Sequence, residues 1–93
     1  MSSYIATAIK MKTGCNNSYD LLEIDEICLN NRSDGWYKKA ELHDHLKKHP
    51  GDITVGTTRG PEVVPCISSN GEKYVKSTPN HYRYDNLLEL PRR

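Results

Sequence analysis

Hydrophobic and polar residues alternate from Tyr4 to Lys12, which is the pattern of a half-buried β-strand. Ile5, Ile9 and Met11 fall on one side of this segment and are expected to face a core. The residues that follow are rich in Gly and Asn, which supply the positive φ angles that a chain reversal needs. The pattern therefore predicts a first strand that ends in a turn.

The segment from Leu21 to Leu29 fits two interpretations. An amphipathic helix would bury one stripe of it. A strand would need a bulge near Asp25-Glu26 to bring Ile27 to the same face as Ile24. We favour the bulged strand, because a Gly/Asn loop after the first strand suits an antiparallel hairpin.

The segment from Trp36 to His49 contains only helix-compatible residues and is followed by Pro50-Gly51, which stops a helix. Leu42 and Leu46 lie one turn apart, so the apolar stripe is narrow. Such a helix can cover a sheet but cannot form a core by itself.

Three further strands are predicted, over residues 52–57, 62–68 and 72–77. Pro65 removes one backbone donor from the second of them, which indicates an edge strand or a bulge. Asn70-Gly71 is the strongest hairpin signal in the chain and joins the second to the third.

Leu87, Leu88 and Leu90 follow the last predicted strand. A solvent-exposed tail gains nothing from these leucines, so we expect a strap that docks back and covers the core. Asp85-Asn86 before them is interpreted as a helix N-cap or an Asx-turn.

The elements follow the order ββαβββ, which predicts an α+β fold: one antiparallel sheet, one helix packed across it and a docked C-terminal strap. A chain of 93 residues is expected to form a single domain over residues 1–93 with a modest core.

The formal net charge is +1, so the totals indicate no strong pull on nucleic acid or acidic lipid. Cys15, Cys28 and Cys66 form no C-x-x-C pair, and an odd number cannot be used up in intramolecular disulfides. No apolar run reaches the roughly 18 residues of a membrane span. We expect free thiols, a cytoplasmic location and no membrane partner.

Two candidate chemistries are weak. His45 and His49 lie four residues apart on the predicted helix, but two ligands do not make a metal site, and no Glu lies between them to act as a base. Cys28 and Cys66 sit in apolar runs, where thiols are inert. We therefore expect no metal, no cofactor and no enzymatic activity.

Aromatic and basic residues gather near the predicted helix entry and in a later segment. Rings beside cations suit single-stranded nucleic acid, since bases stack and phosphates pair with Lys or Arg. Against this stand the small net charge and the lack of a recognisable RNA-binding signature. The candidate residues for binding nucleic acid or a protein partner are Trp36, Tyr37, Lys38, Lys39, His81, Tyr82, Arg83 and Tyr84.

The chain also resembles a family of short bacterial proteins catalogued only as a domain of unknown function. The resemblance rests on an early Ile pair, on Trp36 with the basic helix, on a Tyr-Val-Lys strand, and on a C-terminal Asp-Asn-Leu-x-x-Leu-Pro motif. In that motif the matching residues are Asp85, Asn86, Leu87, Leu90 and Pro91, and Ser77 stands where the family pattern has Thr. The resemblance implies a small cytoplasmic fold with no assigned activity.

Two functions follow as hypotheses. The first is a non-catalytic module that binds an unknown protein partner, or itself, through a sheet edge or the aromatic helix entry. The second is nucleic-acid binding through the Lys-rich helix and residues 81–84.

Overall fold

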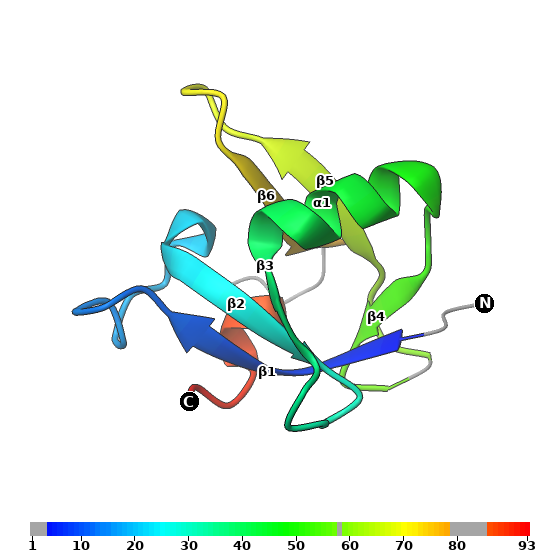
Figure 1. Ribbon diagram of the computed structural model, residues 1–93, viewed down its shortest axis with the longest axis horizontal. Helices are drawn as coiled ribbons and strands as arrows, with labels where there is room; N and C mark the ends of the chain where they lie inside the picture. The colour runs from blue at the N-terminus through cyan, green and yellow to red at the C-terminus, as the bar shows by residue number, and fades with distance from the viewer. Residues whose placement is uncertain (1–3, 58, 79–85) are drawn as a thin grey trace.

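One helix lies against two β-sheets in the computed structural model, which describes residues 4–57, 59–78 and 86–93 (Figure 1). The α+β class is as predicted. The elements in chain order are β1 (Tyr4–Met11), the 3-10 turn η1 (Leu21–Glu23), β2 (Ile24–Leu29), β3 (Trp36–Lys38), α1 (Lys39–Lys48), β4 (Ile53–Val55), β5 (Val63–Ile67), β6 (Lys73–Ser77) and the 3-10 turn η2 (Asn86–Glu89).

The larger sheet has the strand order β3-β2-β1-β4. β1 and β2 form an antiparallel pair, and so do β2 and β3. β4 returns after α1 and lies parallel to the first half of β1. The prediction of a purely antiparallel sheet was therefore wrong here, because the α1 crossover brings the chain back in the direction of β1.

The remaining strands form a second, two-stranded sheet, so the predicted single sheet is also corrected. β5 and β6 are antiparallel, and among the described residues Pro65 lies in a strand that has a ladder partner, β6, on one side alone, as its missing donor indicated. A single bridge between Thr54 and Glu62 links β4 to this hairpin. The second sheet is thus linked to the larger one at β4, and α1 lies beside both sheets (Figure 1).

The β5–β6 hairpin turns at Ser69-Asn70-Gly71, as the Asn-Gly signal predicted. The Gly71 N–H donates to the Ser68 carbonyl at 2.9 Å, and Gly71 has a φ of 84°. A left-handed glycine after such a turn is the three-residue type of hairpin loop.

Bulges set which side chains reach the core. The pairing of β1 with β2 jumps at Asp25, and Ile24 and Ile27 are both buried, so the bulged-strand interpretation is confirmed. A second irregularity at Thr7 was not predicted. It places Ala6 and Ile9 together in the core.

The predicted helix over 36–49 begins three residues too early. Trp36–Lys38 is the edge strand β3, paired with β2, and α1 starts at Lys39. Lys38 has no capping side chain, and the start is fixed by Glu41, whose Oε1 accepts from the Lys38 N–H at 3.0 Å. This hydrogen bond is half of a capping box. The residue that accepts it, Glu41, lies inside the helix, two residues after the first helical residue, Lys39.

The C-terminal strap docks on the core as predicted. Leu87 and Leu88 are buried, and Leu90 packs against them from a partly exposed position. The Ile9 N–H donates to the Pro91 carbonyl at 2.9 Å, so the strap pairs with β1 beyond the point where β4 stops. Asn86 donates from its backbone and side-chain nitrogens to Ser77 Oγ at 3.2 and 3.0 Å. Asp85, the other half of the predicted cap, lies outside the described residues.

The turn between β2 and β3 is built on two consecutive left-handed asparagines, Asn30 with a φ of 59° and Asn31 with a φ of 54°. The Asn30 side chain accepts from the Ile5 N–H at 2.9 Å, and its backbone N–H donates to the Ile5 carbonyl at 2.7 Å. The Asn31 N–H donates to Thr7 Oγ1 at 3.0 Å. These contacts fix the turn against the first half of β1.

Candidate functional site

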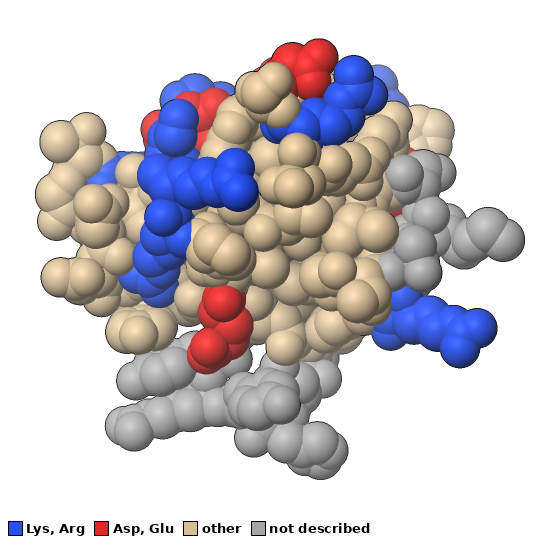
Figure 2. Space-filling view, turned by 90° about the horizontal axis from the view of Figure 1, so that it is seen from below, with Lys and Arg blue, Asp and Glu red and all other residues tan. Residues whose placement is uncertain are grey.

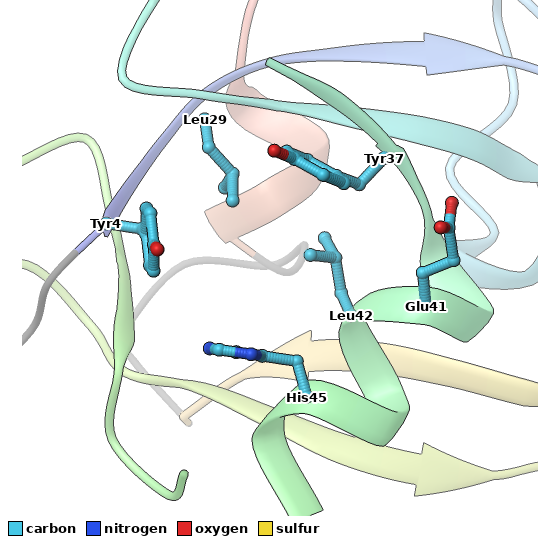
Figure 3. A pocket seen from close by; sticks show the side chains of 6 residues that line it. All are labelled: Tyr4, Leu29, Tyr37, Glu41, Leu42 and His45. Atoms are coloured by element: carbon cyan, nitrogen blue, oxygen red, sulfur yellow. The ribbon is translucent and has the colours of Figure 1, made fainter.

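A pocket of about 260 Å³ opens between α1 and one end of the larger sheet (Figure 3). Tyr4 and Tyr37 stand on opposite sides of it, with Leu29 and Leu42 between them. The two leucines are buried, whereas Tyr4 is 37% and Tyr37 is 42% exposed. The pocket thus has an apolar floor and two aromatic walls that water reaches.

A second hollow of about 140 Å³ shares Tyr4, Leu29 and Tyr37 with the first, so the two are neighbours. Its other lining residues come from the β2–β3 turn and include Arg32 and Asp34. Arg32 Nε lies 3.2 Å from one carboxylate oxygen of Asp34 and Nη2 lies 3.5 Å from the other. The positive charge of Arg32 and the negative charge of Asp34 therefore compensate each other within the hollow.

His45 and Glu41 complete the first pocket from the helix side. His45 Nε2 lies 2.7 Å from Asp52 Oδ2, and its ring meets Tyr4 edge-on at 5.9 Å between centroids. In Figure 3 the imidazole extends towards Tyr4. Glu41 is exposed and makes no ion pair with any described residue. The helix side of the pocket therefore carries one carboxylate, Glu41, beside the imidazole of His45.

The open edge of the larger sheet lies next to the pocket. β3 pairs with β2 on one side and with no strand on the other among the described residues. The Lys38 N–H points to the open side, where Glu41 accepts it. Because backbone groups alternate in direction along a strand, the N–H and carbonyl of Trp36 face the same open side. Tyr37 thus stands between a pocket and an unpaired strand edge.

The structure separates the candidate residues that the sequence grouped together. Tyr37 lines the pocket, whereas Trp36 has Lys10 Nζ over its ring at 4.9 Å. Lys38 Nζ lies 3.1 Å from an Asp25 carboxylate oxygen, and this hydrogen bond is the main reason that the pKa of Lys38 is raised. His81, Tyr82, Arg83 and Tyr84 lie outside the described residues.

Lys39 is buried, and its ammonium lies 2.9 Å from Glu72. Both Lys38 and Lys39 are thus engaged by carboxylates of the same molecule. Figure 2 shows one face of the molecule, on which Lys and Arg lie in separate groups with Asp and Glu among them. On that face the described basic residues do not form one continuous surface, which binding of a nucleic-acid backbone would favour.

His45 and His49, the candidate metal ligands, lie side by side at the C-terminal end of α1. The His45 and His49 rings approach to 4.9 Å between centroids, and His45 is also engaged by Asp52. Within residues 4–57, 59–78 and 86–93, no three His, Cys, Asp or Glu residues are placed to hold a metal ion. Cys28 is buried, and its thiol donates to the Arg32 carbonyl at 3.3 Å, while Cys15 and Cys66 are partly exposed free thiols.

Sequence reasoning missed Tyr4, Leu29 and Glu41 as site residues. Tyr4 was assigned only to the alternation of the first strand. Its large aromatic side chain, on the side of the strand opposite Ile5, could have indicated a site residue. The sequence does not show, however, that the start of β1 lies close to α1.

The family model described as "Protein of unknown function (DUF3892)" matches residues 6–91. The chain belongs to this family. The expected kinship with an uncharacterised family is therefore confirmed. Comparison with curated proteins and with solved structures found no match.

Ser77, which departs from the family pattern, and Leu87 of the C-terminal motif both have a place in the fold. Ser77 retains the hydroxyl that Thr would supply, and this hydroxyl accepts the two hydrogen bonds from Asn86. Leu87 is fully buried. In the described part of the chain no helix has the length and apolar character to cross a membrane.

Proposed function

We propose that this protein is a non-catalytic interaction module of the cytoplasm that binds a segment of a protein partner between Tyr4 and Tyr37. The observation that carries the proposal is the pair of exposed tyrosines facing each other across an apolar floor. Tyrosine is enriched at protein interfaces because it combines a large apolar ring with a polar tip.

The dimensions favour a protein segment over a free small molecule. Pockets for small ligands usually measure about 300–1,000 Å³. The pocket here is about 260 Å³, which suits one inserted side chain. The second hollow adjoins it at Leu29, and the open β3 edge lies beside it. A bound chain can therefore anchor one residue in the pocket and extend along the surface.

A displayed library of random peptides tests this proposal. Peptides are selected on the native protein, and their affinities are then measured for Tyr4→Ala and Tyr37→Ala. We expect each substitution to weaken binding about tenfold or more. This corresponds to a loss of about 1.4 kcal/mol of binding free energy, as for an important interface residue. Lys47→Ala on the exposed side of α1 is the matched control and should bind normally. Selected peptides that bind Tyr37→Ala as tightly as the native protein contradict the proposal.

Two alternatives have distinct outcomes. If the β3 edge pairs with a second copy, sedimentation will show a dimer that Trp36→Pro abolishes, since proline removes the outward N–H. If the protein binds single-stranded RNA or DNA, affinity will appear at low salt and fall steeply as salt is added. We expect no nucleic-acid affinity at low salt, because Lys38 and Lys39 are held in ion pairs.

A further inference from the structure

One carboxylate, that of Glu41, lines the first pocket. Glu41 lines it without an ion pair to any described residue, and Asp52 lies behind His45 at 2.7 Å. Neither Lys nor Arg is among its lining residues. Arg32, in the adjoining hollow, is already paired with Asp34. Glu41 thus places a negative charge at the pocket, and Lys and Arg are absent from its described lining.

Aromatic rings surround the same space. Tyr4 and Tyr37 flank it, and the His45 imidazole extends into it towards Tyr4 (Figure 3). The faces of aromatic rings attract cations through the ring quadrupole, and cages of such rings recognise alkylated ammonium groups. Leu29 and Leu42 below them offer an apolar surface to a methylene chain.

His45 is held at the pocket by its contact with Asp52. In the neutral imidazole, the contact with Asp52 Oδ2 assigns the proton to Nε2. Nδ1 then carries a lone pair. A cationic group entering the pocket would meet the carboxylate of Glu41 and two aromatic walls.

We infer that the pocket binds the ammonium end of a lysine or N-methylated lysine side chain of the partner. This rests on the proposed function and names the chemistry of the inserted residue. The apolar floor takes the alkyl stem, and the tyrosines and Glu41 take the charge. A neutral aliphatic side chain would fill the same floor but would remove water from Glu41 without compensating its charge.

Three blocked tripeptides with glycine on both sides test the inference, with lysine, trimethyllysine or norleucine at the centre. Norleucine keeps an unbranched alkyl side chain and lacks the charge. Binding is followed by NMR shifts of the Tyr37 and Glu41 amides. We expect lysine or trimethyllysine to bind at least about tenfold more tightly than norleucine.

Matched variants separate the contributions. Glu41→Gln keeps the acceptor for the Lys38 N–H and removes the charge, so the helix start is retained while ammonium binding falls about fivefold. Tyr37→Phe keeps the ring and should bind normally, whereas Tyr37→Leu keeps the apolar bulk and should lose about tenfold. Glu89→Gln, an exposed carboxylate in η2, is the charge control.

The outcomes distinguish this inference from the proposed function. If norleucine binds as tightly as lysine and trimethyllysine, the ammonium assignment is overturned while a peptide-binding pocket remains. If none of the three tripeptides binds, the assignment is also overturned, and the library selection decides the proposed function separately. Equal ammonium binding by Tyr37→Phe and Tyr37→Leu would likewise rule out the aromatic contribution.

Discussion

The Lys39 ammonium lies 2.9 Å from a carboxylate oxygen of Glu72, and this ion pair joins the first turn of α1 to the β5–β6 hairpin. Only 10% of the Lys39 side chain is exposed, against 41% for Glu72. Lys12, just beyond β1, approaches the same carboxylate oxygen at 3.5 Å. One carboxylate therefore connects both sheets with the helix.

We predict that Glu72→Gln destabilises the protein at pH 7 and makes its folding stability less dependent on pH in the acidic range. The hydrogen bond from Lys39 is the main reason that the pKa of Glu72 is lowered. A carboxyl group whose folded-state pKa is depressed stabilises the fold above its unfolded-state pKa of about 4.3, and this contribution is lost as the pH falls through the folded-state value. Thermal melting between pH 7 and pH 2 measures both effects.

Glu89→Gln is the control for the loss of one surface carboxylate and should melt like the native protein. Asp44 retains its own acid dependence in both variants, because its pKa is lowered mainly by the hydrogen bond from Lys73. If Glu72→Gln melts at the native temperature at pH 7, the Lys39 contact does not stabilise the fold.

We predict that Asn30→Ala is more destabilising than Asn30→Gly. Both remove the side-chain acceptor of the Ile5 N–H, which costs about 1 kcal/mol. Alanine adds the strain of a left-handed backbone at a φ of 59°, about 1 kcal/mol more, whereas glycine adopts this conformation freely. Urea denaturation gives both free energies of unfolding. Equal values for the two variants would show that the backbone conformation carries no cost.

Local patterns predicted the elements of this fold better than their assembly. The Asp25 bulge followed from the parity of Ile24 and Ile27, and the β5–β6 hairpin followed from Asn70-Gly71. The parallel pairing of β4 with β1 depends on where α1 returns the chain, which no local pattern encodes. The helix start was misplaced because Trp36–Lys38 is also compatible with a helix, and its pairing with β2 is a long-range effect.

The candidate site was predictable only in part. An exposed aromatic near the helix entry was expected, and Tyr37 has that role. The second wall, Tyr4, comes from the start of β1, and it stands across the pocket from Tyr37 because β2 pairs with both β1 and β3. The sequence also could not show that Lys39 is buried, since its partner Glu72 lies far along the chain.

We predict that Cys15 reacts slowly with iodoacetamide and that Glu23→Gln accelerates the reaction. Partial burial is the largest cause of the raised pKa of this thiol, followed by its hydrogen bond with Glu23. Less thiolate is therefore present at pH 8 than in free cysteine. Mass spectrometry follows alkylation of each cysteine, and Cys66 in the same sample is the internal control. A Cys15 that reacts faster than free cysteine would instead indicate an activated nucleophile.

The strap should contribute much of the stability of the fold. Leu87 is fully buried against the core, so Leu87→Ala is expected to cost about 2–5 kcal/mol in the free energy of unfolding. Leu90→Ala should cost less, because Leu90 packs against the core from a partly exposed position. Glu89→Ala, between them in sequence and exposed, is the control with little effect.

A chain that ends before Asn86 tests the backbone part of the same prediction. It removes the buried leucines and also the hydrogen bonds of Ile9 with Pro91 and Arg93, which close β1 where β4 stops. We expect this truncation to destabilise the protein more than Leu87→Ala does, measured by urea denaturation. If the truncated chain unfolds at the native urea concentration, the strap is not part of the core. Its leucines would then be available to a partner, and the motif would be functional instead of structural.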